Sequence, residues 1–240
     1  NLERIRSMTK LHYFKGRGRA ETTRWMLAAN KIDFQNIAIE TPEALAALRA
    51  TGKLPFDQMP LLELDDKNLS QSSAMIRYLA RRGDLYGDND TDALWCDMIA
   101  GVAADFAETA IQAAFQPKPE IAIASQQARF AKFGPRFEAR LSSNSGAFCV
   151  GNRLSFADVV LAEALSSYLE WLPGLLSDTP HLNDLYNRMI EHDGIASYLR
   201  SEQRYLKAGD DYVIDAARVL ERALPTHFPD ADRFEIGRAH

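Results

Sequence analysis

The sequence has few cysteines and none in a metal-binding or redox pattern. Cys96 and Cys149 are the only two, and no CxxC or paired His-Cys spacing surrounds them. A disulfide framework and a metal site are therefore not expected, and a reducing compartment, the cytoplasm, is the predicted location. Cys149 lies in the apolar run 147–150, which is typical of a buried, unreactive thiol.

Long apolar runs and a strong charge bias are also missing. No stretch approaches about 18 consecutive apolar residues and no signal peptide is visible, so we expect no membrane insertion. The net charge of -5 is modest and the charges are interspersed, which argues against a nucleic-acid partner. Met8 looks like a natural start, so residues 1–7 are left out of the fold prediction, as are residues 235–240.

The chain does have the apolar content for a sizeable core. Its 240 residues are 46% hydrophobic and 25% charged, as in an ordinary globular protein. That length suits one large domain or two small ones.

Strand and helix signals alternate over roughly the first eighty residues. The predicted order is a strand at 11–14, a helix at 20–29, a strand at 34–39, a helix opened by Thr41 and Pro42, a strand at 59–64, a turn at 65–68 with a short return strand at Leu69, and a helix after the N-cap residues 70–73. This β-α-β-α-β-β-α order predicts a small four-stranded α/β sheet.

The character of the sequence changes after 85–88. From 91 to 222 the patterns are helical, with almost no strand signal. We therefore predict an α/β domain at 8–85, an all-α domain at 91–222 and a C-terminal extension at 223–240. The best-marked helix start is Ser155, where Asp158 can reach back in a short-armed relative of the capping box, and we interpret this motif as a stability element.

Three segments of the predicted α/β domain converge on one edge of its sheet. They are Tyr13 with the turn 16–19, the segment 58–60, and Gln71 with Ser72 at a helix N-terminus. Ligands of open α/β sheets gather at such an edge. Each segment is a weak signal alone. Pro60 stands at the entry to a strand after an apolar residue, where a cis peptide bond would leave the Met59 backbone free to pair with an extended peptide ligand. The alternative, a trans proline at a sheet edge, is the more common one, since only ~5–6% of X–Pro bonds are cis.

Taken together, these segments resemble the soluble glutathione transferases, most closely the alpha class. The resemblance is carried by KLHYF at 10–14, GRGRAE at 16–21, RWMLAA at 24–29, FDQMP at 56–60, LSQS at 69–72 and GNRLSFAD at 151–158, with a weaker match at 212–221. The order and spacing agree over nearly the whole chain. The resemblance implies a thioredoxin-like domain followed by a helical bundle.

The resemblance also implies that Tyr13 is catalytic. Its hydroxyl would donate to the sulfur of glutathione, the co-substrate, and hold it as thiolate. Arg19 would lie close to the sulfur and stabilise the same negative charge. A surface charge at the start of a helix is the alternative for Arg19.

Glutathione would be held by residues of the predicted α/β domain and by one residue of a second subunit. The positions implied by the family are Arg49, Gln58, Met59, Pro60, Gln71, Ser72 and Asp105, with the last reaching the glutathione amine of a neighbouring subunit in a homodimer. Lys53 is an additional candidate, although a solvated surface lysine is the more common role. An exposed helical aspartate is the alternative for Asp105. Phe56 would be the aromatic key inserted into the partner.

The acceptor pocket is where the match to the family fades. Its implied residues are Phe14, Gly16, Ile111, Gln112, Phe115, Val213 and Ala217. Gln112 is more polar than the alpha-class pattern, and 224–234 has no counterpart. These departures leave the acceptor substrate open.

Three functions follow from the resemblance. The first is conjugation of glutathione to apolar electrophiles. The second uses the same thiolate in a ketosteroid or prostanoid isomerase or in thioether cleavage. The third is a non-catalytic binding protein on the same fold, against which the presence of both Tyr13 and Arg19 speaks. Transferase classes based on serine or cysteine are disfavoured, because Tyr13 occupies the catalytic place.

Overall fold

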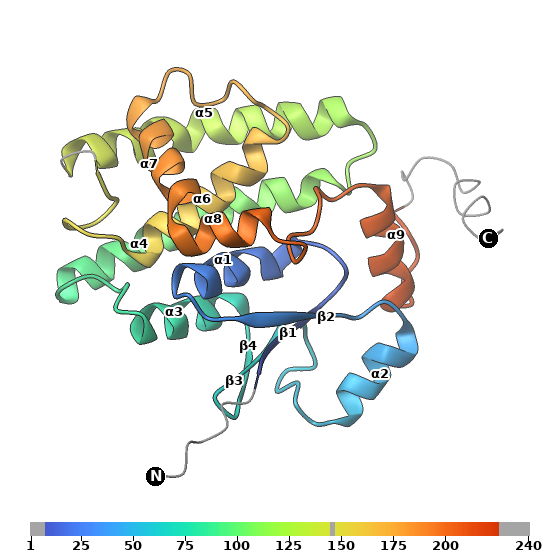
Figure 1. Ribbon diagram of the computed structural model, residues 1–240. Coiled ribbons are helices and arrows are strands. Elements are labelled where there is room, and N and C mark those ends of the chain that lie inside the picture. The colour runs from blue at the N-terminus through green and yellow to red at the C-terminus, as the bar shows by residue number, and fades with distance from the viewer. Residues whose placement is uncertain (1–7, 145–146, 226–240) are drawn as a thin grey trace, which may run out of the picture.

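A small mixed sheet lies on one side of the molecule and a bundle of helices on the other (Figure 1). The computed structural model describes residues 8–144 and 147–225. The sheet has four strands in the order β2-β1-β3-β4. The strands are β1 (Thr9–Tyr13), β2 (Phe34–Ala38), β3 (Leu61–Leu64) and β4 (Lys67–Ser70). The fold class predicted from the sequence, a thioredoxin-like α/β unit followed by an all-helical unit, is confirmed.

The register of the sheet sets the place of Tyr13. Strands β1 and β2 run parallel and pair Tyr13 with Ala38, whereas β3 pairs antiparallel with both β1 and β4. Tyr13 is the last residue of β1, so it lies at the carboxyl end of that strand. This is the edge where ligands of open α/β sheets collect.

Three α-helices belong to the sheet unit. They are α1 (Glu21–Ala29), which follows a short 3-10 turn at Gly18–Ala20, α2 (Pro42–Ala50) and α3 (Ser72–Arg82). The predicted start of α2 is confirmed, because the Thr41 hydroxyl accepts from the Ala44 N–H and Pro42 is the first helical residue. Gln71 precedes α3 with a φ of 67°.

The described residues of the second unit form six helices. They are α4 (Asp90–Ala113), α5 (Pro119–Ser143), α6 (Phe156–Leu169), α7 (Pro180–Glu191), α8 (Asp193–Arg200) and α9 (Asp210–Val219). Helix α6 is apolar almost all round and is packed by α1, α4 and α7. A helix of that composition is stable only in a core. The largest hydrophobic cluster accordingly runs from Trp25 of α1 into α6 and joins the two units.

The start of α6 is the stability element that the sequence predicted. The Asp158 carboxylate accepts from the Ser155 N–H at 2.8 Å and from the Cys149 N–H at 2.6 Å. Burial raises the pKa of Asp158, while these backbone N–H bonds act in the opposite direction. The carboxylate therefore fixes the loop before α6 as well as the helix itself.

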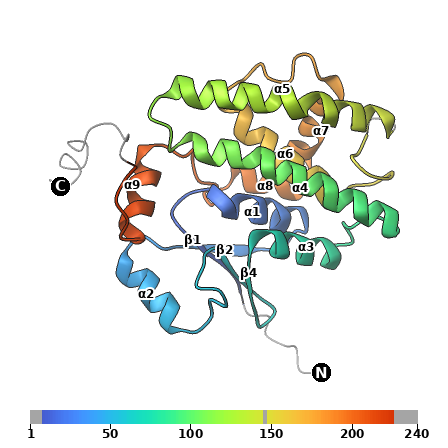
Figure 2. The ribbon, with the colours of Figure 1, turned by 180° about the vertical axis from the view of Figure 1, so that it is seen from behind.

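Helix α9 lies apart from the other helices of its unit. Figures 1 and 2 show it at the side of the molecule, next to α2 of the sheet unit. Val219 from α9 is buried in a second hydrophobic cluster with Leu45 and Leu48 of α2. The last described helix of the chain is thus anchored on the first domain.

Several predicted boundaries were wrong by one or two residues. Strand β1 begins earlier than predicted and ends before Phe14, and β3 begins at Leu61. The turn after β3 is shorter than predicted, since Lys67 and Asn68 already belong to β4. Of the two alternatives for Pro60, the more common trans one is wrong: the Met59–Pro60 peptide bond is cis.

Helix α3 ends at Arg82 and α4 begins at Asp90, on either side of the predicted change of character. Of the predicted extension 223–240, all but residues 223–225 lie outside the described residues. No helix within the described ranges is long and apolar enough to span a membrane.

Candidate functional site

The sheet unit and helix α4 enclose a cleft of about 1030 Å³. The cleft brings together many residues that the sequence singled out. They are Tyr13, Phe14, Arg19, Arg49, Phe56, Gln58, Met59, Pro60, Gln71, Ser72 and Ile111. These residues come from β1, the turn after it, α2, the loop before β3, the start of α3, and α4.

Tyr13 is buried, with 6% of its surface exposed. Its hydroxyl oxygen accepts the backbone N–H of Arg19 at 3.2 Å, and its ring packs edge-on against Phe14 at 5.0 Å between centroids. A phenol has one proton to donate and lone pairs to accept with. Since the Arg19 N–H uses a lone pair, the Tyr13 proton can serve an acceptor in the cleft.

A second tyrosine lies beside the first. The Tyr212 hydroxyl, from the first turn of α9, is 3.5 Å from the Tyr13 hydroxyl, and the Tyr212 ring packs edge-on against Phe115 at 6.2 Å. Burial and the neighbouring Tyr13 raise the pKa of Tyr212. Tyr212 therefore stays protonated at neutral pH and adds a second O–H group next to Tyr13.

Two glycines of the turn after β1 make room for these hydroxyls. A Cβ on Gly18 would stand 2.7 Å from the Tyr13 oxygen and 2.5 Å from the Tyr212 oxygen, and Gly18 has a φ of +40°. A Cβ on Gly16 would overlap the ring of Tyr212. Both the left-handed backbone of Gly18 and the close approach of the hydroxyls require glycine there.

Arg19 lies at the mouth of the cleft. Its guanidinium pairs with the Glu108 carboxylate of α4 at 2.8 Å, and its side chain is 57% exposed. Its backbone carbonyl accepts from the Ser72 hydroxyl at 2.8 Å. Arg19 thus links the turn after β1 to both α3 and α4, and its contact with Tyr13 is made by its backbone N–H.

The remaining predicted binding residues form polar pairs along the cleft. Gln71 donates to the Gln58 side chain at 2.9 Å, and Arg49 pairs with Asp57 at 2.6 Å. Ser72 is the first residue of α3, so the positive end of that helix faces the cleft. Lys53 does not line the cleft; it pairs with Glu63 at 2.6 Å.

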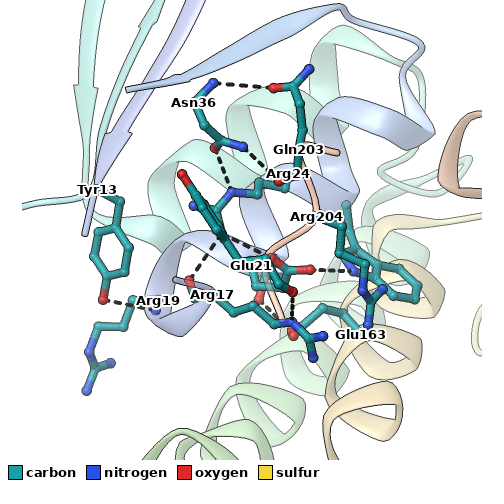
Figure 3. A network of polar contacts seen from close by, with 12 residues as sticks. Tyr13, Arg17, Arg19, Glu21, Arg24, Asn36, Glu163, Gln203 and Arg204 are labelled. Atoms are coloured by element: carbon teal, nitrogen blue, oxygen red, sulfur yellow. Dashed lines mark hydrogen bonds and ion pairs between the residues drawn. The ribbon is translucent and has the colours of Figure 1, made fainter. Parts of the chain in front are cut away.

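A network of buried charges lies behind the turn that carries Arg19 (Figure 3). The Arg24 guanidinium is 1% exposed; it pairs with Glu21 at 3.0 Å and donates to the Arg17 carbonyl at 3.3 Å. The Arg17 guanidinium in turn pairs with Glu170 of the helical unit at 2.6 Å. Because buried ions are stable only when paired, the network holds the turn rigidly between the two units.

Glu163 of α6 belongs to the same region and lines a small chamber of about 50 Å³. It accepts from the Thr22 hydroxyl at 2.8 Å. Burial, together with repulsion from Glu21, raises the pKa of Glu163 to about 7. The opposite wall of the chamber is apolar and comes from α4, with Ala107, Ala110, Ile111 and Ala114.

The residues predicted for the acceptor pocket are only partly brought together. Ile111 lines both the cleft and the chamber, and Phe14 lines the cleft. Phe115 contacts Tyr212 instead, and Gln112 donates to Glu108 at 2.8 Å. Gly16 and Ala217 line a separate groove of about 900 Å³ on the outer side of α9, and Val213 is buried.

Asp105 and Phe56 face away from their own subunit's cleft or stand at its rim. Asp105 shares an exposed face of α4 with Leu94 and Met98, at spacings that place all three on one side of a helix. Phe56 is 66% exposed. Exposed apolar side chains such as Phe56 in its loop and Leu94 with Met98 on α4 are typical of surfaces that bind a partner.

Neither cysteine is suited to catalysis or metal binding. Cys96 and Cys149 are free and buried, and burial raises the pKa of both, that of Cys96 to about 11. Within the described part of the chain, no group of His, Cys, Asp and Glu side chains could hold a metal ion.

Sequence reasoning missed Tyr212, Glu163 and the network around Arg24. A signal existed for two of them. Glu163 interrupts the apolar run that begins at Val159, and Arg24 precedes Trp25 in an apolar helix. A charged residue in such a place predicts a buried ion pair or a shifted pKa.

Comparisons with known proteins agree on one family. The model of the glutathione S-transferase N-terminal domain matches residues 9–81, and that of the C-terminal domain matches residues 104–202. The chain is 34% identical to glutathione S-transferase alpha-5 of Rattus norvegicus, over 88% of this chain and 96% of that protein. It is 35% identical to alpha-4 of the same species, over 88% and 96%.

A solved structure gives the same result. The glutathione S-transferase from Ascaris lumbricoides has a TM-score of 0.72 and 26% identity, and the match covers 84% of this chain and all of that one.

Proposed function

Because the chain belongs to the glutathione S-transferase family, we propose that it transfers glutathione to apolar electrophiles and that Tyr13 holds the sulfur as thiolate. One observation carries the proposal above all. The buried Tyr13 hydroxyl accepts the Arg19 N–H at 3.2 Å, which leaves its own proton to be donated into the cleft.

The cleft suits an extended tripeptide with a charge at each end. The γ-glutamyl carboxylate would lie at Gln71 and Ser72, where the N-terminus of α3 favours an anion. The backbone of Met59, next to the cis Pro60, would pair with the cysteinyl unit. The glycyl carboxylate would lie near Arg49, in place of or beside Asp57.

The sulfur in this position would be a thiolate at neutral pH. A free thiol has a pKa of about 8.5. A hydrogen bond from Tyr13 favours the charged form of the sulfur, and the permanent charge of Arg19 adds to the effect. The thiol proton passes to solvent, and the thiolate then attacks the electrophilic carbon of the acceptor, where its electron pair forms the new C–S bond. The bond that breaks at that carbon gives its electron pair to the leaving group in a substitution, or to the adjacent atom, which then takes a proton from solvent, in an addition.

The acceptor would approach from the side of α4 and α9. The alanines of α4 give an apolar wall, and the protonated Tyr212 hydroxyl stands at the sulfur end of it. Product analysis separates conjugation from isomerisation. Conjugation consumes the free thiol of glutathione, whereas an isomerase returns it.

We also propose that two copies of the chain form the functional dimer. The exposed Phe56 would enter the partner, and Asp105 would reach the glutathione amine bound in the other subunit. The exposed stripe of Leu94 and Met98 next to Asp105 supports this arrangement. Both cysteines are free, which is consistent with a reducing compartment, the predicted cytoplasm.

An ultraviolet titration of bound glutathione in Tyr13→Phe tests the mechanism. Losing a hydrogen bond to a charged group costs about 1.5–3 kcal/mol, so the pKa of the bound thiol should rise by about 1 to 2 units. Conjugation should fall while the affinity for glutathione is nearly unchanged. Tyr186 of α7 is another partly buried tyrosine, so Tyr186→Phe is the matched control. It should leave the thiol pKa as in the wild type.

An unchanged thiol pKa in Tyr13→Phe would remove Tyr13 from the mechanism. A wild-type protein that does not bind millimolar glutathione would favour the non-catalytic function instead.

A further inference from the structure

Helix α9 and the residues that end it contact both sides of the candidate site. At its start, Tyr212 lies 3.5 Å from the Tyr13 hydroxyl. At its end, Val219 is buried against α2, and Leu220 packs against the same cluster. Arg222 follows one turn later, where its backbone N–H donates to the Ala217 carbonyl at 2.9 Å.

Arg222 differs from the other arginines of the cleft in having no carboxylate partner among the described residues. Four arginines line it: Arg19, Arg49, Arg77 and Arg222. The first three each pair with a carboxylate, at 2.8, 2.6 and 2.7 Å. Among the residues that the structure describes, the Arg222 guanidinium has no carboxylate within 4.0 Å. An exposed, uncompensated guanidinium in a cleft is suited to an anionic ligand.

The position of Arg222 along the cleft selects the end of the ligand that it can reach. Leu220, two residues before Arg222, packs on the cluster formed with Leu45 of α2. Arg49 lies one helical turn after Leu45 on the same helix. Leu45, Leu220 and Arg222 all line the cleft, and Arg222 lines the groove outside α9 as well. Its short distance along the chain from Leu220 assigns Arg222 to the α2 end of the cleft rather than to the α3 end, where Ser72 lies.

If the proposed function holds, the two carboxylates of glutathione determine which group of the ligand lies at the α2 end of the cleft. Glutathione has a carboxylate at each end, and the helix N-terminus at Ser72 suits the γ-glutamyl end. The glycyl carboxylate remains for the α2 end. Since Arg49 already has Asp57 as a partner at 2.6 Å, a free guanidinium adds a charge that Arg49 alone does not supply.

We propose that Arg222 binds the glycyl carboxylate of glutathione together with Arg49, and that the bound co-substrate thereby fastens α9 over the sulfur. This inference rests on the proposed function, because it takes glutathione as the occupant of the cleft. Arg222 follows α9 directly, so its contact with the ligand restrains the helix that carries Tyr212. Glutathione binding and the ordering of the acceptor side are then one event.

Calorimetry with two ligands tests the contact. The ligands are glutathione and its glycyl ethyl ester, which lacks only the charge in question. Arg222→Gln should weaken binding of glutathione roughly 5- to 10-fold and leave binding of the ester within about twofold. Arg218→Gln is the matched control. Arg218 lies one turn earlier, pairs with Asp215 and lines the outer groove rather than the cleft, so it should bind both ligands as the wild type does.

Hydrogen exchange of the α9 backbone tests the coupling. Glutathione should slow exchange of the α9 amides in the wild type and in Arg218→Gln but not in Arg222→Gln, and the ester should slow it in none of the three. A general structural role of Arg222 would change exchange in the absence of ligand as well.

Two results would overturn the proposal. One is an Arg222→Gln variant that loses affinity for acid and ester alike, or for neither. The other is α9 exchange that responds to glutathione equally in all three proteins. If the wild type binds neither ligand, the proposed function fails and the role of Arg222 fails with it. If the wild type binds glutathione and its thiol titrates through Tyr13, the proposed function stands whatever Arg222 does.

Discussion

Alanine in place of Gly18 separates backbone strain from the placement of the two hydroxyls. Gly18 has a φ of +40°, where an L-residue costs about 1–2 kcal/mol. The added Cβ would also stand 2.7 Å from the Tyr13 oxygen and 2.5 Å from the Tyr212 oxygen. Ordinary contact needs about 3.5 Å, so each hydroxyl has to move by roughly 1 Å. A displacement of that size at a reacting group costs on the order of 10²-fold in rate.

Gly52 supplies the matched control for this experiment. It has a φ of +69°, and a Cβ built on it has no other atom within 4 Å. Gly52→Ala therefore carries the same kind of backbone strain, about 1–2 kcal/mol, without touching the site.

The assay combines urea unfolding with kcat/KM for conjugation and the thiol pKa of bound glutathione. Both variants should lose stability. Only Gly18→Ala should lose about 10²-fold in kcat/KM and show a raised thiol pKa. The reasoning is refuted if Gly18→Ala, while still folded, conjugates no more slowly than Gly52→Ala, because the crowding at Tyr13 would then have no catalytic consequence.

Two further changes probe the partner surface and the buried carboxylate. Phe56→Ser should weaken the dimer by about 1.5–3 kcal/mol per ring, measured by sedimentation. Leu206→Ser, at an 87% exposed site, is the control and should leave the dimer unchanged. An unaltered dimer in Phe56→Ser would show that Phe56 is not the aromatic key of the dimer. Burial raises the pKa of Glu163 in the folded protein to about 7, above the ordinary value of 4.5, so the folded protein holds a proton that the unfolded chain has lost. As the pH rises from 4.5 to 7, the free energy of unfolding of the wild type should therefore fall by about 3 kcal/mol relative to that of Glu163→Gln. If urea unfolding gives both proteins the same dependence on pH, the pKa of Glu163 is not raised.

The sequence predicted those parts of the fold that depend on neighbouring residues. Thr41 and Pro42 start α2, and Ser155 with Asp158 starts α6, because caps act over a few residues. The edge that gathers Tyr13 with Ser72 also followed from the strand order, since the end of β1 and the start of α3 share one edge.

The contacts that the sequence did not predict join distant parts of the chain. Tyr13 and Tyr212 are 199 positions apart in the sequence, and no local pattern predicts that the start of α9 returns to the end of β1. The small error at the turn after β3 has a different cause. Asp65 and Asp66 both take a positive φ, so two residues suffice for the reversal where four were predicted.

The two halves of the proposed reaction are carried by different kinds of structure. The sulfur side depends on backbone: the end of β1, the Arg19 N–H and the glycine at 18. The turn that carries the last two is held at the Arg17 carbonyl by the buried Arg24, which pairs with Glu21. The acceptor side depends on the size of side chains on α4 and on the placement of α9. Changes to the acceptor wall, such as a larger residue at Ala110, should therefore alter which electrophiles fit without disturbing the thiolate.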